Sequence, residues 1–171
     1  RKQFDIDLIA VTGSNGKTTV TQMLATILRA QYGDSAMATS GNLNNEIGVP
    51  MMALRLRAHH KAAVLELGMN HPGEIARLAA TAQPTVALVN NAQREHLEFM
   101  GTIEAVAQEN GSVFHFLSHK GVAVYPADDP FTPLWRQLTQ AQEVVEFGAN
   151  SSAVYLQKAN WTDAGWALQV S

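Results

Sequence analysis

The chain has 171 residues, 46% of them hydrophobic and 16% charged, and its formal net charge is −3. This length and composition are typical of one soluble globular domain with a substantial core. The acidic balance argues against nucleic acid as the main partner, because binding to a phosphate backbone requires a concentrated basic surface. Cysteine is absent, which excludes disulfides and thiolate metal sites and fits a reducing compartment such as the cytoplasm.

No apolar run approaches the roughly 20 residues needed to cross a bilayer, and residues 1–5 lack the apolar stretch of a signal peptide. We therefore expect a cytoplasmic protein without a membrane span. The chain starts just before one expected strand and ends inside another, at residues 167–170. This favours a piece of a longer enzyme.

Short apolar runs rich in β-branched residues alternate with helical patterns. Strands are expected at residues 8–11, 63–67, 86–89, 122–125 and 144–147. Most of these runs are continuous rather than alternating, which is typical of strands covered on both faces. The pattern predicts an α/β fold with a mostly parallel sheet flanked by helices.

Helices are expected between these strands, at residues 18–30, 73–82 and 102–117. In the first, Met23, Leu24, Ile27 and Leu28 recur at helical spacing. A fourth helix is expected to begin at Asp129-Pro130, as N-cap and first residue, and to run towards Leu138. After Gly148, residues 154–157 and 166–170, separated by Thr162-Asp163-Ala164-Gly165, predict a C-terminal β-hairpin that either extends the sheet or starts a small flap.

The most specific motif is a glycine-rich loop at residues 12–19, which follows a buried strand and opens a helix. Glycines let the backbone turn its N–H groups towards phosphate oxygens, and the helix N-terminus adds partial positive charge. Lys17 is expected to reach the terminal phosphates of ATP, and the Thr18 hydroxyl to bind Mg²⁺. The predicted ATP-binding residues are Gly13, Ser14, Asn15, Gly16, Lys17, Thr18 and Thr19. The alternative is a tight strand–helix turn with a solvated lysine.

Two further side chains are candidates for the same site. Glu66 is a charged residue inside an apolar strand, and a buried carboxylate favours a metal or another cation as partner. His96 follows the next strand, and ligands of parallel sheets collect beyond the carboxyl ends of the strands. The alternatives are a salt-bridged glutamate at a sheet edge and a plain surface histidine. The remaining histidines are expected at the surface: His59, His60, His71, His115 and His119.

Together these segments resemble the central ATP-binding domain of the Mur ligases, a family related to folylpolyglutamate synthetase. The short loop TGSNGKTT has that family's form, with two residues between Gly13 and Gly16. The likeness runs over about residues 9–148 and includes three further stretches. These are GNLNNEIGVP at 41–50, ELGMNHPGEI at 66–75 and GVAVYPADD at 121–129. They are most similar to the ligases that add D-alanyl-D-alanine to UDP-MurNAc-tripeptide in peptidoglycan precursor synthesis.

The resemblance implies an ATP- and Mg²⁺-dependent amide ligase that works through an acyl phosphate. It implies that Glu66 and Thr18 bind one magnesium and that His96 helps to bind a second, with Lys17 and His96 as catalytic residues. Asn42, Asn44 and Asn45 become candidates for orienting the substrate carboxylate or metal-bound water. The alternative for these asparagines is an Asn-rich loop with turn chemistry.

The sequence departs from the family pattern in two ways. Many Mur ligases carry a carbamylated lysine where this chain has Asn110, so metal support has to come from the Asn110 amide, another group or water. The chain also stops before the family's adenine-contacting segment, and it lacks the N-terminal UDP-binding and C-terminal domains. Residues 1–171 are therefore expected to be a truncated central domain.

Three other functions remain open at this stage. The first is another ligase of the superfamily, adding a different amino acid or polyglutamate. The second is a P-loop GTPase or regulatory switch, which predicts an Asn-Lys-x-Asp motif that the sequence does not contain. The third is a binding module without catalytic activity.

Overall fold

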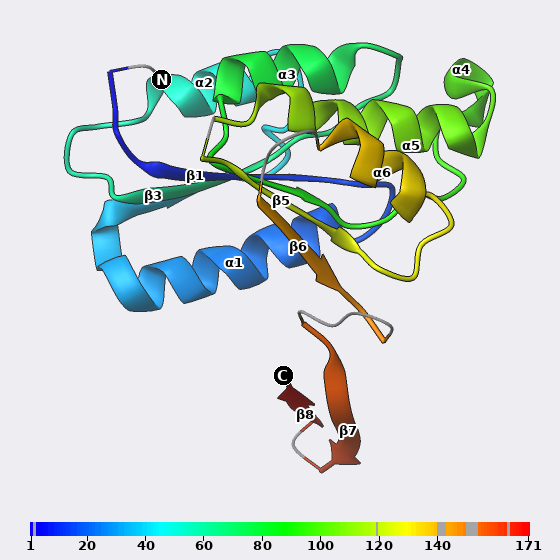
Figure 1. Ribbon diagram of the computed structural model, residues 1–171. Coiled ribbons are helices and arrows are strands. Elements are labelled where there is room, and N and C mark those ends of the chain that lie inside the picture. Colours follow the sequence, from blue (N-terminus) through cyan, green and yellow to red (C-terminus); the bar gives the residue numbers. More distant parts are fainter. Residues whose placement is uncertain (2, 119, 140–142, 150–153, 164) are drawn as a thin grey trace.

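A six-stranded sheet, parallel at every pairing, forms the centre of the computed structural model, which describes residues 1, 3–118, 120–139, 143–149, 154–163 and 165–171. The strands follow the spatial order β2-β3-β1-β4-β5-β6, with helices on both faces (Figure 1). Their bounds are β1 Asp7–Thr12, β2 Ala36–Ala38, β3 Ala62–Glu66, β4 Val86–Val89, β5 Val122–Pro126 and β6 Glu143–Phe147. The predicted α/β class is confirmed.

All five expected sheet strands are present, with boundaries that differ by one or two residues at most. β3 is buried at every position, as expected for a strand with neighbours on both sides and helices on both faces. The short strand β2 was not predicted, because Ala-Met-Ala has no β-branched residue and no alternation. It pairs with β3 through Ala36, Met37 and Ala38.

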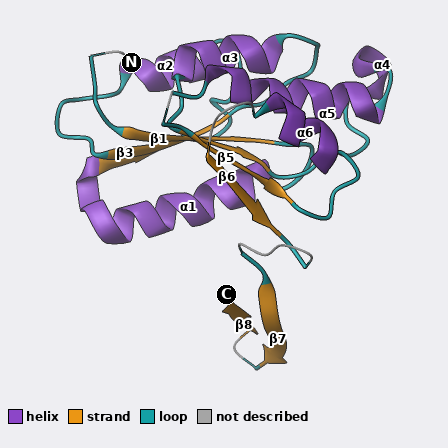
Figure 2. Cartoon of the chain, viewed as in Figure 1, coloured by secondary structure: helices purple, strands orange, loops and turns teal. Residues whose placement is uncertain are grey.

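One helix covers the first face of the sheet and the others cover the second (Figures 1 and 2). Helix α1, Lys17–Tyr32, lies alone on its face, where Ala25 packs with Val11 and Val64. The second face carries α2 Gly48–Leu54, α3 Glu74–Ala82, α4 Leu97–Met100, α5 Ile103–Gly111 and α6 Thr132–Leu138, with the 3-10 turn Ser112–Phe116 after α5; a second 3-10 turn, Gly33–Ser35, follows α1.

Two expectations about the helices are corrected by the structure. In α1 the exposed fractions of Met23 and Ile27 are 62% and 64%, so this pair faces away from the core. The contact with the sheet comes from buried Thr21 and Ala25, with Leu24 and Leu28 packed beside them. The helical spacing of apolar residues therefore predicted a wider buried stripe than α1 has. The fully buried positions of this stripe are the smaller residues Thr21 and Ala25.

The second correction concerns the start of α6. The helix begins at Thr132, so Asp129-Pro130 lies before it rather than at its N-cap. Asp129 Oδ1 accepts the Phe131 N–H at 2.9 Å and Oδ2 accepts the Ala92 N–H at 3.3 Å. Asp129 thus forms a turn tied to the segment after β4, and α6 starts two residues later than expected.

The larger core cluster lies under the second group of helices and is built around three aromatic residues, Phe114, Tyr125 and Trp135. The Phe114 and Tyr125 ring centroids are 5.8 Å apart and those of Tyr125 and Trp135 are 6.2 Å apart. Trp135 is fully buried, and its Nε1–H donates to the Ala107 carbonyl at 2.9 Å. This contact joins α6 to α5 and holds α5 against the sheet.

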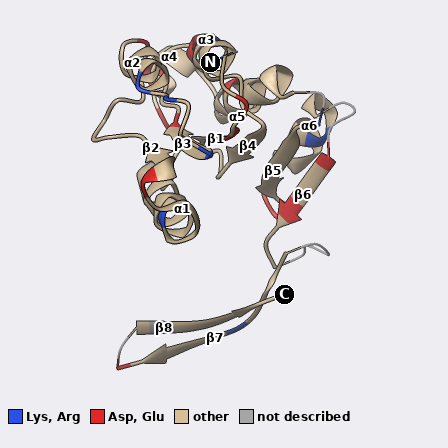
Figure 3. Ribbon diagram, turned by 90° about the vertical axis from the view of Figure 1, so that its left-hand side faces the viewer, with Lys and Arg blue, Asp and Glu red and all other residues tan. Residues whose placement is uncertain are grey.

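The C-terminal hairpin is confirmed and forms a separate two-stranded sheet. Its strands are β7 Leu156–Thr162 and β8 Gly165–Val170, so the first begins two residues later than expected and Ala164 of the predicted turn lies outside the described residues. Every residue of β7 is exposed, and the hairpin lies apart from the layered core (Figures 1 and 3). Within the described ranges, no helix combines the length and the apolar character needed to cross a membrane.

The strand register explains how distant segments meet at one edge of the sheet. Val11 pairs with Glu66 on β3, and Thr12 pairs with Val89 on β4. The chain therefore leaves β1, β3 and β4 at the same level. The glycine-rich loop, the segment after Glu66 and the segment before His96 all emerge together at this carboxyl edge.

Candidate functional site

The glycine-rich loop turns sharply between β1 and α1. Gly13 and Gly16 have φ angles of +130° and +76°, which residues with a Cβ rarely adopt. A Cβ at Gly13 would also lie 3.0 Å from the Asn91 backbone nitrogen and 3.1 Å from Asn90 Cβ. Glycine is therefore required at position 13 for both the backbone angle and the space.

The tip of this loop is bound to the segment that follows β4. The Ser14 N–H donates to the Asn91 carbonyl at 3.1 Å, and the Asn15 N–H donates to Asn91 Oδ1 at 2.9 Å. The Asn90 amide donates to the Asn15 carbonyl at 2.7 Å, and Ser14 Oγ accepts the Gln93 N–H at 2.9 Å. Asn90, Asn91 and Gln93 were not predicted as site residues, although their polar run directly after a buried strand is a visible signal.

The Lys17 ammonium lies inside the loop at the first residue of α1. Its Nζ donates to the Gly13 carbonyl at 2.6 Å, to the Ser14 carbonyl at 3.2 Å and to Glu95 Oε1 at 2.9 Å. The side chains of Lys17 and Glu95 are each 14% exposed. Thr18 and Thr19 follow in the first turn of α1, and both are exposed. Lys17 is thus held by the loop and by one carboxylate that sequence reasoning missed.

Asn110 holds the beginning of the same loop from below. Its side chain is fully buried; Oδ1 accepts the Thr12 hydroxyl at 2.5 Å and the Gly13 N–H at 3.0 Å, while Nδ2 donates to the Val106 carbonyl at 3.1 Å. Both ends of the amide are therefore engaged by the protein. Asn110 therefore shapes the loop. Of the three sources of metal support that the sequence left open, another group or water fits better than the Asn110 amide.

Glu66 ends β3 as a buried carboxylate, 3% exposed. β3 lies between β2 and β1, so the alternative of a salt-bridged residue at a sheet edge does not fit. Glu66 Oε1 accepts the Asn44 amide at 2.8 Å. Within the described residues no Lys, Arg or His side chain forms an ion pair with it. A buried carboxylate with an amide as its partner favours the approach of a cation.

The three asparagines of the loop before α2 have different surroundings. Asn44 contacts Glu66 and packs so tightly over Gly68 that a Cβ there would lie 3.1 Å from its amide nitrogen. Asn45 lines the pocket, and its Oδ1 accepts the N–H groups of Ile47 and Gly48 at the start of α2. Asn42 is exposed and is not among the residues that line the pocket. Asn45 thus lines the pocket and also takes part in the turn before α2, whereas Asn42 lies outside the pocket.

His96 lies at the start of α4 in a left-handed conformation, with φ 47° and ψ 38°. A non-glycine residue pays a conformational cost there, and such strain is concentrated at functional positions. Its Nε2 lies 4.0 Å from Glu95 Oε1 and its Nδ1 lies 3.9 Å from Glu98 Oε1. The side chain is 35% exposed, so the ring is accessible beside the Lys17–Glu95 pair.

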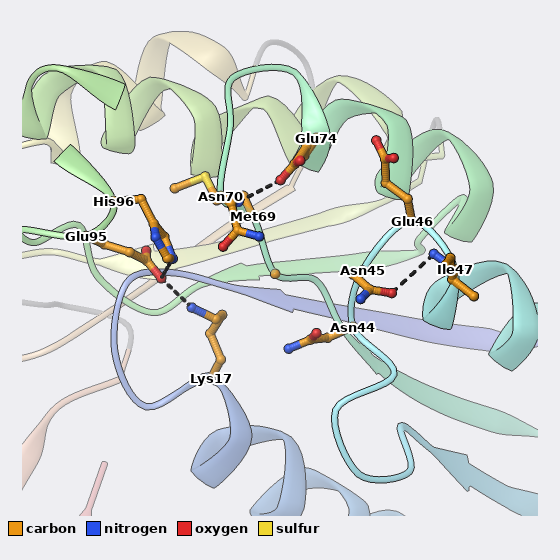
Figure 4. A pocket seen from close by; sticks show the side chains of 11 residues that line it. Lys17, Asn44, Asn45, Glu46, Ile47, Met69, Asn70, Glu74, Glu95 and His96 are labelled. Carbon is orange, nitrogen blue, oxygen red and sulfur yellow. Dashed lines mark hydrogen bonds and ion pairs between the residues drawn. The ribbon is translucent and has the colours of Figure 1, made fainter. Parts of the chain in front are cut away.

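These groups surround one pocket of about 430 Å³ at the carboxyl edge of the sheet (Figure 4). Its lining residues are Lys17, Asn44, Asn45, Glu46, Ile47, Gly68, Met69, Asn70, Glu74, Glu95 and His96. The structure therefore brings together Lys17, His96, Asn44 and Asn45 from the predicted set, with Glu66 directly behind Asn44. The contributions of the segments at 46–47 and 69–74 were not predicted, because only the tertiary fold brings them to this edge.

Glu74 forms one wall and is fixed by local hydrogen bonds. Its Oε2 accepts the Asn70 and His71 N–H groups at 2.6 and 3.1 Å. Partial burial alone would raise the pKa of Glu74, but these bonds and the His71 ring outweigh burial and lower it. Glu74 therefore stays ionised at neutral pH and orders the turn before α3.

The remaining histidines carry no sign of a site. Three of them lie at the surface as expected: His59, His71 and His115. His60 is half-buried and so fits that expectation only in part. The His71 ring packs against Phe99 with centroids 4.4 Å apart. His119 lies outside the described residues.

The donor set at the pocket fits a magnesium ion that is only partly held by the protein. No group of three His, Cys, Asp or Glu side chains in the described part of the chain could enclose a metal by itself. Mg²⁺ usually takes one or two carboxylates and completes its shell with water and substrate phosphates. The buried Glu66 carboxylate meets that requirement, because Glu66 pairs with Val11 at the edge of the sheet where the glycine-rich loop begins.

Comparison with known proteins places this arrangement among characterised folds. The model of the Mur ligase middle domain matches residues 11–170. The UDP-N-acetylmuramoyl-tripeptide–D-alanyl-D-alanine ligase of Escherichia coli is 42% identical over 152 residues, which cover 89% of this chain and 33% of the relative. The chain thus spans about a third of the length of the curated relatives it matches.

Solved structures give the same result. A crystal structure of MurF from Acinetobacter baumannii superposes with a TM-score of 0.89 at 35% identity, covering 96% of this chain and 35% of that one. MurF ligase from Thermotoga maritima, solved in complex with ADP, superposes with a TM-score of 0.87 at 29% identity, covering 99% of this chain and 39% of that one.

Proposed function

The chain belongs to the Mur ligase family, and we propose that it supplies the ATP and magnesium site of a ligase that joins D-alanyl-D-alanine to UDP-MurNAc-tripeptide. The observation that carries this proposal is the shared pocket of Lys17, Asn44 and His96, with the Glu66 carboxylate behind it. The relatives named for this reaction are 42% and 41% identical over most of this chain. They support the choice of substrates.

The glycine-rich loop is suited to the phosphates of ATP. The N–H groups at the N-terminus of the 16-residue helix α1 offer partial positive charge, whereas those of Gly13, Ser14 and Asn15 donate to Asn110 and Asn91 and fix the loop. Lys17 adds a full charge at the same point. These groups together would stabilise the charge that builds up on the transferred phosphoryl group. The ATP site would comprise residues 13–19.

The residues that would hold magnesium are Thr18, Glu66 and His96. Thr18 follows Lys17 in the first turn of α1, Glu66 ends β3, and His96 borders the pocket. When bound, the ion would neutralise phosphate charge and so permit an anionic nucleophile to approach. Asn44 donates to Glu66 and would keep that carboxylate turned towards the pocket.

The reaction joins two substrates in two steps. The tripeptide carboxylate attacks the γ-phosphorus of ATP, and the bond to the β–γ bridging oxygen breaks. ADP departs, and the product is an acyl phosphate of the tripeptide. The amine of D-alanyl-D-alanine then attacks the acyl carbon, phosphate departs and the amine loses a proton. Both partners in the first step are anionic, so the protein contributes charge neutralisation and alignment. Asn44 and Asn45, which line the pocket, would orient the attacking carboxylate, and Asn42 is the weakest of the three candidates.

The proposal includes the rest of the enzyme. The relatives are about three times as long as the matched segment, so we infer an N-terminal UDP-binding domain and a C-terminal domain in the same polypeptide. The adenine-contacting residues would lie in the later part of that polypeptide. The cytoplasm, where ATP is available, would be its location.

The direct test is ATP consumption by the full-length protein with UDP-MurNAc-tripeptide and a series of amine acceptors. We expect ADP release that depends on both the tripeptide and D-alanyl-D-alanine. Release with a single amino acid instead would retain the ligase class and reject this acceptor. Nucleotide binding without acceptor-dependent turnover would reject the ligase function in favour of a switch or binding module.

A further inference from the structure

The hydrogen bonds of Lys17 leave its ammonium group fully occupied. An ammonium has three N–H donors, and Lys17 directs them at the Gly13 carbonyl, the Ser14 carbonyl and Glu95 Oε1. Two of these partners belong to the loop that would receive the phosphates. The third, Glu95, comes from the segment after β4. Before Lys17 can donate to a phosphate, it has to release one of these bonds.

Glu95 is the partner that a phosphate would replace. Its carboxylate is the anionic acceptor in the set, and Figure 4 shows it directly beside the Lys17 ammonium. An incoming phosphate offers the same chemistry, a charged oxygen acceptor for an ammonium donor. Glu95 thus takes the position beside the Lys17 ammonium that an anionic ligand would take.

Glu95 depends on Lys17 more than an ordinary surface carboxylate would. The side chain is 14% exposed, and its second oxygen, Oε2, is buried and accepts no hydrogen bond from the described residues. Its other basic neighbour is the His96 ring, with Nε2 4.0 Å from Oε1. Removing Lys17 from Glu95 therefore leaves a poorly solvated carboxylate, which is costly unless another cation arrives.

The other two carboxylates that line the pocket, Glu46 and Glu74, already have partners. Glu46 is paired with Arg77 at 2.7 Å, and Glu74 accepts two backbone N–H groups. Lys17 is the single Lys or Arg among the lining residues that the structure describes. A nucleotide that takes Lys17 would therefore place phosphate charge next to Glu95 with no spare protein cation between them.

We propose that Glu95 makes nucleotide binding dependent on a divalent cation, because it competes with phosphate for Lys17 and yields only when a metal accompanies the nucleotide. A nucleotide without metal has to displace Glu95 and then remain beside its charge. A magnesium nucleotide brings the cation that Glu95 needs, and the carboxylate then turns to the ion or to its bound water. Glu95 is thus a positioning residue that acts through Lys17, and this role rests on the proposed ATP site.

The test is the affinity of the full-length protein for ADP, measured by calorimetry with Mg²⁺ and again with EDTA. The quantity compared between variants is the dissociation constant in EDTA divided by the dissociation constant in Mg²⁺. In Glu95→Gln the amide keeps the shape and the acceptor but loses the charge. We expect the ratio to fall about tenfold or more, mainly because ADP binds more tightly in EDTA. Glu95→Ala should change the ratio in the same direction.

Glu98→Gln is the matched control. Glu98 lies in the same segment and its Oε1 is 3.9 Å from His96 Nδ1, but its side chain is 65% exposed and it does not contact Lys17. Its ratio should stay within about twofold of the wild-type value, because an exposed charge is screened by salt.

The outcomes separate the two proposals. A ratio in Glu95→Gln and Glu95→Ala equal to that of the wild type would overturn the role of Glu95, even if both affinities fell together through damage to the loop. A fall of the same size in Glu98→Gln would also overturn it, since any nearby charge would then suffice. Failure of the wild-type protein to bind ADP in either condition would instead reject the proposed nucleotide site.

Discussion

The glycine-rich loop and the C-terminal hairpin are both short turns with a glycine at a positive φ angle, but they are held in different ways. In the loop, Gly13, Ser14 and Asn15 make hydrogen bonds to residues 75 to 97 positions away along the chain. In the hairpin, β7 pairs with β8 only a few residues later, and all seven residues of β7 are exposed. The loop is therefore a product of the tertiary fold, whereas the hairpin is a product of local pairing.

This difference has a functional consequence. A phosphate site requires several N–H groups and a lysine in fixed positions, and distant anchors such as Asn91 and Asn110 supply that fixation. An exposed hairpin has few buried contacts, so its stability comes from its own ladder and it is expected to open at low free energy. Changes in the core and in the loop anchors should therefore damage the site, and changes in the hairpin should not.

The largest expected effect is on the core beneath the site. Trp135→Ala removes a fully buried side chain and the hydrogen bond to the Ala107 carbonyl. We expect a loss of about 3–5 kcal/mol in the free energy of unfolding, measured by urea denaturation of the chain. A loss below about 1 kcal/mol would contradict the packing of α6 on α5.

Lys17→Ala should lower turnover more than it lowers stability. Loss of a group that stabilises developing charge typically costs about 10²- to 10³-fold in rate, and we expect ATP-dependent turnover of the full-length protein to fall by at least that factor. Because the substitution leaves Glu95 without its cation, the double variant Lys17→Ala with Glu95→Gln separates that cost from catalysis. Near-normal turnover in either variant would reject the assignment of Lys17.

Asn110→Ala tests whether a distant anchor shapes the loop. It leaves the Gly13 N–H and the Thr12 hydroxyl without their acceptor, which should cost about 1–3 kcal/mol. Weaker ADP binding should accompany this loss of stability. The control is Gln108→Ala on the exposed face of the same helix, which should be nearly neutral.

A double-mutant cycle sharpens this prediction. Thr12→Val combined with Asn110→Ala should be less harmful than the sum of the two single changes, because both remove the same hydrogen bond. Additive effects would show that the Thr12–Asn110 hydrogen bond contributes little and that Asn110 acts through its other contacts.

The smallest expected effect is in the hairpin. Leu168 on β8 is 60% exposed, so Leu168→Ala should change the free energy of unfolding of the chain by no more than about 0.5 kcal/mol. ADP affinity should not change. A larger loss, or weaker ADP binding, would break the distinction between the two regions.

Sequence patterns predicted much of this fold because the strands of a doubly covered parallel sheet are continuous apolar runs. The five main strands were found in this way, and the hairpin was found from two short strand-like segments on either side of a turn signal. β2 was missed because its three residues carry no such signal. α2 was missed because its first turn contains Gly48 and Pro50 and directly follows an Asn-rich stretch that predicts a loop. The exposure of Met23 and Ile27 was not predicted, since helical spacing alone does not say how wide the buried stripe is.

The candidate site was only partly predictable for a related reason. Lys17 and the loop glycines belong to a motif whose spacing carries the chemistry. Glu95 and Asn110 do not, because their importance comes from the atoms they meet, Lys17 Nζ and the Thr12–Gly13 backbone. The roles of Thr18, Glu66 and His96 in binding metal stay predictions.

The sequence by itself determined the α/β class, the phosphate-type loop and the family resemblance, because these depend on local pattern and on short motifs. Only the tertiary structure decided that Glu95 pairs with Lys17, that Asn110 is committed to the loop, and that Asn44 rather than Asn42 reaches Glu66. The physical reason is the parallel register, which brings the ends of β1, β3 and β4 to one level. Residues far apart in the chain become neighbours there, and no local pattern records that proximity.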